Sequence, residues 1–304
     1  MDESGGDVTT AWVFPGQGAQ AVGMGKALAE SDSGARARFA EADETLGFAL
    51  SRMIWEGPED ALAQTDVQQP AILVVSIVHF EVLQRRGLLP VTAYAAGHSL
   101  GQYAAAVATG ALPFADAVRI VRRRGEAMQA HGRGAMAAVL GMDADAVRAI
   151  ADEAGAELAN VNAPGQVTIA GRMDAVERAA SLAKERGARR VMMLPVSAAF
   201  HTSLMRPVVD ELAPLLDAAP FTDPAVPIVS NVDARLLRTA DDLRAELRGH
   251  ITASVQWVRT IETLRDAGMT DYIEIGPGNI LAGLIKRIDK DARSQTSDAL
   301  LAAS

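Results

Sequence analysis

The spacing of apolar and polar residues predicts strands and helices in alternation along most of the chain. Residues 11–14 form a short apolar run that stops at PGQG, and residues 19–30 have the alanine, leucine and lysine content of a helix. Over 70–87, apolar positions recur at spacings of three and four before arginines and a glycine, which predicts a buried helix leading into a strand over 92–96. The last stretch, DARSQTSDALLAAS, is expected to fray. The alternation indicates an α/β fold.

Residues 135–196 repeat strand and helix signals in an order of their own. A strand and a helix are followed by two strands about a Pro-Gly turn, and then by a second helix and a last strand. This βαββαβ order is that of the ferredoxin-like split unit. Because strand signals resume at 230–232 and over 271–288, the unit is predicted to be a small domain inserted in a larger one. The predicted boundaries are 1–133 and 197–304 for the large domain and 134–196 for the small one.

The composition limits the class of protein, its partners and the type of nucleophile that can be expected. Of the 304 residues, 49% are hydrophobic and 22% are charged, which is typical of a globular protein. The acidic N-terminus lacks a secretory pattern and no apolar run reaches the roughly 18 residues of a membrane span, so we expect a cytoplasmic protein. The net charge of −9 argues against nucleic-acid and membrane partners. With no cysteine in the chain, serine is the expected covalent nucleophile.

The segment GHSLG, residues 97–101, contains a candidate nucleophile, Ser99. It lies between a predicted strand and an alanine-rich helix signal. In that context a tight turn exposes the serine oxygen and points the start of a helix at it. The bare pattern matches by chance about once in ten chains of this length, so the strand and helix on either side favour a nucleophile elbow over a packing turn.

A serine nucleophile needs a base within hydrogen-bonding reach. The histidines are His79, His98, His131, His201 and His250. His79 falls in the apolar helix pattern, and His131 and His250 fall in loop and charged segments, where a satisfied or exposed imidazole is expected. His98 adjoins Ser99, but a turn points neighbouring side chains apart. His201 follows an apolar strand and precedes an amphipathic helix, and since sites collect at strand ends in α/β folds, it is the candidate base.

Several motifs occur together in one order: FPGQGAQ, GHSLG, RRGEAMQ, NAPGQVTIAG, AFHTSLM, SVQW and EIGPGNIL. In this order and spacing the chain resembles malonyl-CoA:acyl-carrier-protein transacylases and the related acyltransferase domains of polyketide synthases, from about residue 11 to 288. The resemblance implies an α/β-hydrolase-like large domain with an inserted ferredoxin-like small domain. It also implies malonyl transfer from malonyl-CoA to the phosphopantetheine thiol of an acyl carrier protein, through an acyl-serine, for fatty-acid or polyketide synthesis. No cofactor and no metal are expected, and the enzyme is expected to be a monomer.

The same resemblance assigns roles to single residues. Ser99 is the implied nucleophile and His201 the implied base. Arg124, in RRGEAMQ, would bind the malonyl carboxylate, because a guanidinium makes two parallel charge-assisted hydrogen bonds that lysine cannot reproduce. The other implied site residues are Gln17 and Leu100, whose amides would form the oxyanion hole, Gln256, which marks the loop whose main chain orients the histidine, and His98, Asn162 and Phe200, which would line the site.

One position departs from the family pattern. The family usually reads GHSxGE, whereas residue 102 here is glutamine. Gln102 keeps the size and an acceptor but removes a charge, so any role that depends on a carboxylate beside the elbow is in question. Phe200, by contrast, resembles the bulky residue found where malonyl is preferred over methylmalonyl.

Alternative functions share part of the pattern. A serine thioesterase or acyl hydrolase that edits carrier proteins would use Ser99 and His201, but it would gain nothing from Arg124 and would need an acidic residue between them in chain order. A transacylase for another extender unit would use the same acyl-serine chemistry with a different acyl group. A non-catalytic carrier-binding module would need neither the nucleophile nor the base. Because carrier proteins are typically acidic, docking is expected on local basic residues. The candidates are Arg189, Arg190, Lys286 and Arg287.

Overall fold

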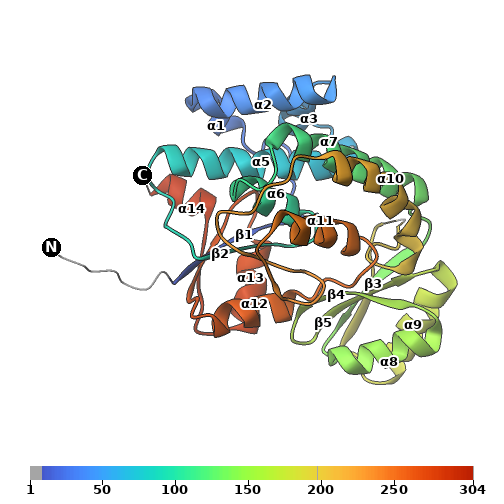
Figure 1. The fold of residues 1–304 in the computed structure, drawn as a ribbon. Helices are drawn as coiled ribbons and strands as arrows, with labels where there is room; N and C mark the ends of the chain where they lie inside the picture. Colours follow the sequence, from blue (N-terminus) through green and yellow to red (C-terminus); the bar gives the residue numbers. More distant parts are fainter. Residues whose placement is uncertain (1–8, 197, 304) are drawn as a thin grey trace.

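Two separate sheets organise the chain, which the computed structural model describes over residues 9–196 and 198–303 (Figure 1). In sheet order, the large sheet consists of β10 (Arg293–Thr296), β9 (Asp271–Glu274), β1 (Thr10–Phe14), β2 (Tyr94–Gly97), β7 (Ile228–Val229) and β8 (Leu236–Leu237). Its neighbours are parallel except for β7 and β8. The α/β prediction is therefore confirmed; the acidic N-terminal stretch considered as a leader lies, up to residue 8, outside the described residues.

The small sheet is antiparallel throughout. In sheet order it consists of β4 (Glu157–Ala163), β5 (Gln166–Gly171), β3 (Ala135–Leu140) and β6 (Arg190–Met193). Its helices, α8 (Ala144–Ala154) and α9 (Met173–Glu185), pack on it through one apolar cluster that includes Val147, Val176 and Ile169. The βαββαβ order predicted for this region is confirmed, and the domain boundary at 134–196 stays a prediction that encloses all these elements.

Helices cover both faces of the large sheet (Figure 1). They are α1 (Lys26–Ser31), α2 (Ser33–Leu46), α3 (Leu50–Glu56), α4 (Glu59–Leu62), α5 (Thr65–Arg85), α6 (Gly101–Ala108), α7 (Phe114–His131), α10 (Arg206–Ala218), α11 (Ala240–Gly249), α12 (Trp257–Asp266), α13 (Ile280–Ile288) and α14 (Ser297–Ala302). Successive residues of a strand face opposite sides. Phe14 accordingly joins the cluster that contains the apolar residues of α5, whereas Val13 packs with Trp257 and Leu281 on the other side. Burial on both faces explains the continuous apolar run of β1.

The helix predicted from residue 70 begins earlier, at Thr65, and Pro70 lies inside it. Proline has no N–H for the carbonyl four residues before it, which would leave the oxygen of Asp66 without its helical donor. Arg122 supplies a donor from α7, with Nη1 2.7 Å from that oxygen. By length and composition α5 meets the requirement for a membrane span, contrary to the sequence expectation, but 89% of the apolar window is buried within the protein, so α5 is its core helix.

Three further expectations are wrong at the level of single elements. The segment from residue 19 forms turns first, and α1 begins only at Lys26. The C-terminal stretch predicted to fray instead adds β10 beside β9 and continues into α14, which is capped by Thr296. Pairing with β9 stabilises β10 although its residues, RSQT, are polar. The strand expected at 230–232 ends just before it, at Val229.

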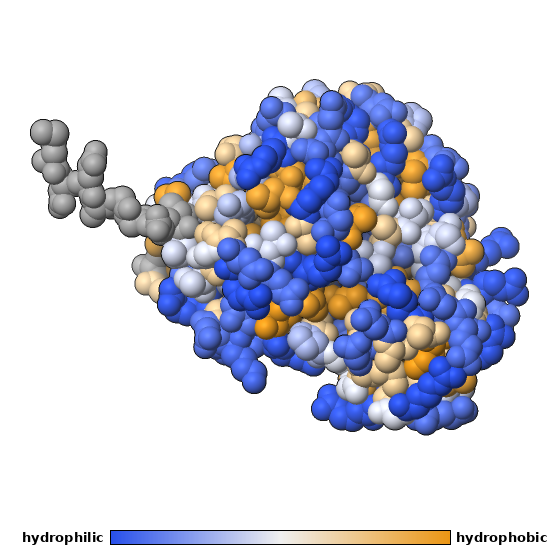
Figure 2. All heavy atoms as spheres, turned by 60° about the horizontal axis from the view of Figure 1, so that its bottom comes forward, coloured by the Kyte–Doolittle hydropathy of each residue, from blue (hydrophilic) through white to orange (hydrophobic). Residues whose placement is uncertain are grey.

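The surface of the protein, like its composition, is typical of a globular protein. Hydrophilic residues dominate the face seen in Figure 2, and hydrophobic residues form separate patches between them. The few large apolar side chains that are exposed come from distant parts of the described chain. They are Val22, Val91, Met173, Met193, Leu204, Leu215 and Ile280.

Candidate active site

The predicted elbow forms between β2 and α6, and Ser99 is at its tip with a φ of 52°. A left-handed backbone at a non-glycine residue is strained and is found where the surroundings hold it in place. Here the surroundings are backbone: a Cβ at Gly97 would lie 1.9 Å from the carbonyl carbon of Gly101, and one at Gly101 would lie 2.1 Å from the oxygen of Phe14. Close packing therefore requires both glycines of the motif: Gly97 within the turn itself, where it meets the backbone of Gly101, and Gly101 against the end of β1.

His201 meets Ser99 across the fold. Its Nε2 lies 2.8 Å from Ser99 Oγ, and its Nδ1 lies 2.7 Å from the main-chain oxygen of His250. A carbonyl only accepts hydrogen bonds, so Nδ1 carries the proton and Nε2 is left as the acceptor for the serine hydroxyl. This is the tautomer that a general base requires. His201 has a φ of 61°, so both partners of this pair have left-handed backbone.

The carbonyl that orients His201 lies in the loop that Gln256 was expected to mark. It belongs to His250, at the beginning of the loop that ends at Gln256. The main-chain N–H of Gln256 donates instead to the oxygen of Asn231, at 2.7 Å. The sequence resemblance therefore indicated the correct loop but not the residue that contacts the histidine.

The electrostatic surroundings keep His201 neutral. Burial lowers the pKa of its imidazole to about 3, and the positive charge of Arg124 acts in the same direction. The hydrogen bond to the His250 carbonyl opposes this shift only in part. His201 is thus an unprotonated acceptor beside a serine hydroxyl over the whole neutral pH range.

Arg124 is the third group at this point. Its side chain is 1% exposed; Nη1 donates to Gln69 Oε1 at 2.6 Å and Nη2 donates to Ser99 Oγ at 3.1 Å. Within residues 9–196 and 198–303 no carboxylate pairs with it, and its buried Nε has no partner. Burial lowers the pKa of the guanidinium, yet arginine stays charged in proteins. The site therefore contains a buried cation without a counter-ion, next to the serine oxygen.

The arginines that precede Arg124 in sequence have a different environment. Arg119 pairs with Asp116, Arg122 with Asp66 and Glu126, and Arg123 with Glu126 and Glu211. Arg119 and Arg123 are exposed and Arg122 is half-buried, and each has an acidic partner. The sequence cluster thus consists of three arginines in ion pairs and one buried arginine.

Of the two amides proposed for an oxyanion hole, that of Leu100 belongs to the elbow and that of Gln17 belongs to the loop that the elbow packs against. A Cβ at Gly16 would lie 2.6 Å from the oxygen of His98, so the loop after β1 touches the turn directly. The side chain of Gln17 is held by Gln68 at 2.6 Å and by Gln69 at 3.2 Å. In the described part of the chain, the main-chain N–H groups of Gln17 and Leu100 donate to no other group.

A cavity of about 120 Å³ opens beside the elbow. It is lined by Pro15, Gly16, Gln17, His98, Asn162, Gln166, Ile280, Leu281 and Leu284. His98 Nε2 and Asn162 Oδ1 are 2.8 Å apart, so the large domain and β4 meet at its wall. Phe200 does not line this cavity; it is buried in the main apolar cluster next to His201. A larger cavity, about 320 Å³, lies beside α14 and contains none of the candidate residues.

Residues that the sequence did not single out complete the site. Asn231 accepts the main-chain N–H of Ser99 through Oδ1, at 2.7 Å, and Gln69 orients Arg124. His250, whose imidazole was expected to be satisfied or exposed, is fully buried and contributes its main-chain carbonyl. Asn231 lies within 230–232, which the sequence predicted to be a strand, whereas in the structure it directly follows β7, at the strand end where sites collect. Among the described residues, no group of three or more His, Cys, Asp or Glu side chains could hold a metal ion.

The comparisons with known proteins agree with this geometry. Residues 11–302 match the family described as Acyl transferase domain. The chain is similar to the malonyl CoA-acyl carrier protein transacylase of Bacillus subtilis, with 45% identity over 288 residues that cover 92% of this chain and 90% of that one.

Two solved structures extend the comparison. The chain is similar to an acyl carrier protein S-malonyltransferase from Vibrio cholerae, with a TM-score of 0.93 and 40% identity over 97% of this chain and 100% of that one. It is also similar to a malonyl-transacylase solved in complex with a type II PKS acyl-carrier protein, with a TM-score of 0.93 and 38% identity over 97% and 98% of the two chains.

The low pKa of His201 generates a testable prediction about Ser99. Because the base stays neutral, the rate at which a serine-directed sulfonyl fluoride modifies Ser99 should change less than about twofold between pH 8 and pH 5.5. An imidazole with the ordinary pKa near 6.5 would lose about tenfold over that range. Intact-mass kinetics measure the rate, with circular dichroism at each pH to verify folding. The His201→Ala variant should not react, and a rate halved near pH 6.5 would contradict the environment described.

Proposed function

The chain belongs to the acyl transferase domain family, and we propose that it transfers a malonyl group from malonyl-CoA to the phosphopantetheine thiol of an acyl carrier protein. One observation carries the proposal: the buried Arg124 guanidinium has no carboxylate partner in the described chain and lies 3.1 Å from Ser99 Oγ. A malonyl thioester has a carboxylate two bonds from the carbonyl that Ser99 would attack. The substrate itself would supply the counter-ion.

The first half of the reaction loads the enzyme. Ser99 Oγ attacks the thioester carbonyl while His201 Nε2 takes the hydroxyl proton, and the amides of Gln17 and Leu100 hold the oxyanion. When the tetrahedral intermediate collapses, the carbon–sulfur bond breaks and the imidazolium protonates the leaving sulfur. Coenzyme A departs, and a malonyl ester remains on Ser99.

The second half runs the same steps in reverse with a different thiol. His201 takes the proton of the phosphopantetheine thiol, whose sulfur attacks the serine ester. The oxyanion forms again at the same amides, and Ser99 Oγ leaves with the proton that His201 returns. The first half-reaction converts a thioester to an oxygen ester and the second converts that oxygen ester back to a thioester, so one site serves both, and the reaction needs neither a metal nor an organic cofactor.

Arg124 explains selection for a dicarboxylic acyl group. Its planar fork can form paired charge-assisted hydrogen bonds with the malonyl carboxylate, whereas an acetyl group would leave the buried charge uncompensated. A hydrolase with the same Ser99 and His201 would have no use for such a cation. Phe200, buried beside His201, is proposed to disfavour the extra methyl group of methylmalonyl. We further propose that the enzyme is a monomer in the cytoplasm.

Carrier docking is proposed on a basic surface at one end of the small sheet. Leu140 pairs with Gln166 on one side and with Arg190 on the other, and Arg287 donates to Gln166 Oε1 from α13. Gln166 also lines the cavity beside the elbow. Arg189, Arg190, Lys286 and Arg287 form no ion pair within the described residues, unlike most other arginines. Unpaired cations near the entrance suit an acidic partner.

The mechanism first predicts that a covalent acyl-enzyme forms on Ser99. After brief exposure to malonyl-CoA without carrier, intact-mass spectrometry should find one malonyl adduct on the wild type and none on Ser99→Ala. Free malonate without an adduct would instead indicate a hydrolase. Neither an adduct nor free acid would favour a carrier-binding module.

Arg124 should control selectivity. Arg124→Ala is expected to lower the rate of malonyl adduct formation by about tenfold to a hundredfold, the usual range for a lost charged hydrogen bond, and to affect acetyl transfer far less. Single-turnover rates with malonyl-CoA and acetyl-CoA provide the comparison. Equal losses with both substrates would mean that the arginine only supports Ser99 and Gln69.

Charge reversal tests the docking surface. Arg190→Glu should lower kcat/KM for the carrier protein about tenfold, and it should weaken the dependence of that parameter on salt. Arg172→Glu is the matched control, since Arg172 is an exposed arginine of the same domain that already pairs with Asp174. Unchanged carrier kinetics in Arg190→Glu would remove this residue from the docking surface.

A further inference from the structure

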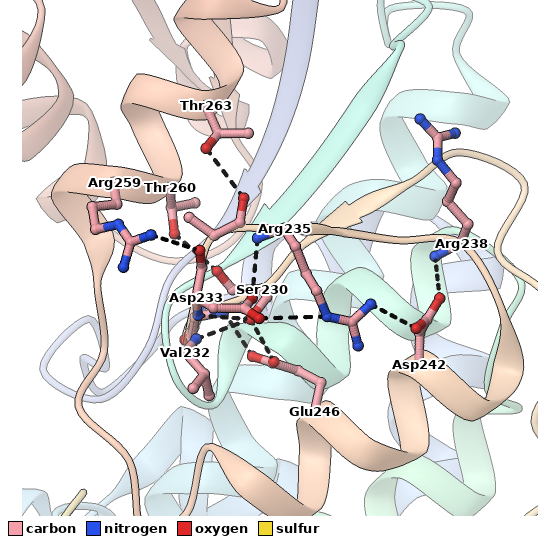
Figure 3. A network of polar contacts seen from close by, with 12 residues as sticks. Ser230, Val232, Asp233, Arg235, Arg238, Asp242, Glu246, Arg259, Thr260 and Thr263 are labelled. Atoms are coloured by element: carbon pink, nitrogen blue, oxygen red, sulfur yellow. Dashed lines mark hydrogen bonds and ion pairs between the residues drawn. The ribbon is translucent and has the colours of Figure 1, made fainter.

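A buried carboxylate that the proposed steps do not use lies beneath the elbow. Glu246, on α11, is 6% exposed. Its carboxylate accepts hydrogen bonds from Ser230 Oγ at 2.7 Å, from the main-chain N–H of Asn231 at 2.7 Å and from Gln102 Nε2 at 3.2 Å. Figure 3 shows it pointing from α11 into the loop that contains Ser230. Burying a carboxylate costs free energy of folding, so the presence of Glu246 among three donors points to a functional role.

The nearby basic side chain forms no ion pair with Glu246. Arg235 pairs with Asp242, at 2.6 Å, and with Asp233, at 3.5 Å (Figure 3). The direct partners of the carboxylate are therefore hydrogen-bond donors, and Arg235 acts on it only electrostatically, from beyond ion-pair distance. Burial raises the pKa of Glu246, and the donors from Ser230, Asn231 and Gln102 act against that rise. The geometry is that of an anchor for polar groups rather than that of a salt bridge.

The first connection runs from Glu246 to the nucleophile. Asn231, whose main-chain N–H bonds to the carboxylate, accepts the N–H of Ser99 through Oδ1 and donates to the oxygen of Gly97 through Nδ2, both at 2.7 Å. The Asn231 side chain is thus hydrogen-bonded to the elbow on both sides of His98. The position of Asn231, and with it the strained backbone of Ser99, depends on the carboxylate below.

The second connection runs from Glu246 to the base. Its main-chain oxygen accepts from the N–H and from Nδ1 of His250, both at 2.9 Å. The oxygen of His250 in turn accepts from His201 Nδ1. Glu246 therefore holds the elbow through its side chain and the histidine-orienting carbonyl through its main chain.

Gln102 completes the arrangement from α6. Its Nε2 donates to Glu246 and also to the oxygen of Val229, at 2.9 Å, so an amide suits this position while the acid is at 246. We propose that Glu246 is a positioning residue for acyl transfer: it supplies from α11 the carboxylate that the family pattern has at residue 102, and its carboxylate fixes Ser99 and the His201 loop relative to each other. The inference rests on the proposed acyl-serine mechanism.

The test compares Glu246→Gln with a double variant that moves the carboxylate. The amide of Glu246→Gln presents a donor to groups that are themselves donors, so the single-turnover rate of malonyl adduct formation should fall at least about tenfold, with half-saturation by malonyl-CoA changed less than about twofold. Gln102→Glu alone should also be slow, because two carboxylates would face each other. Gln102→Glu/Glu246→Gln should be faster than either single variant and within about tenfold of wild type.

Asp242→Asn is the matched control. Asp242 caps the same helix one turn earlier and contacts neither the elbow nor His250, so this variant should lose thermal stability but acylate at the wild-type rate. A folded Glu246→Gln that acylates at the wild-type rate would overturn the inference, and so would a double variant no faster than Glu246→Gln. If Glu246→Gln does not fold, the double variant decides: folding with acylation supports the inference, and failure of either overturns it. A wild type that forms no adduct would instead contradict the proposed function.

Discussion

The close approach of the Ser99 turn to the end of β1 is the constraint on which the rest of the site depends. Glycine at 101 lets the backbone of the turn meet the backbone of β1, glycine at 97 lets the turn close on itself, and these contacts hold Ser99 in its left-handed conformation. With the turn so placed, the serine oxygen faces His201, and α6 begins directly after Leu100. Parallel strands with their carboxyl ends at one edge bring these segments together.

A second feature is the imbalance of charge around the serine. The histidine is oriented by a neutral carbonyl rather than a carboxylate, and among the described residues Arg124 is the only charged side chain that hydrogen-bonds to Ser99 Oγ. Acidic groups of the described chain bond elsewhere: Glu211 and Glu126 pair with arginines of α7, and Glu246 accepts hydrogen bonds below the elbow. In the proposed mechanism this imbalance favours an acyl group that brings its own carboxylate.

Local patterns predicted much of this molecule, and long-range contacts account for what they missed. The α/β alternation, the βαββαβ unit and the Ser99 turn each have a signature in a short segment, so sequence alone was sufficient. The His250 carbonyl has none, because every residue has one and only the fold selects it. Glu246 resembles a solvated residue of a charged helix, and β10 is a polar stretch that pairing with β9 makes a strand. Pro70 was tolerated within α5 because Arg122, distant in sequence, replaces the missing donor.

The proximity of Arg124 to His201 has a consequence for the order of catalytic events. In the free enzyme burial, and after it the guanidinium of Arg124, lower the pKa of the imidazole. In the proposed mechanism a malonyl carboxylate paired with Arg124 would offset the second effect and leave the first, so it would raise the basicity of the histidine in part. An acyl group without a carboxylate would leave both effects in place. The carboxylate would thus act on the proton transfer as well as on binding.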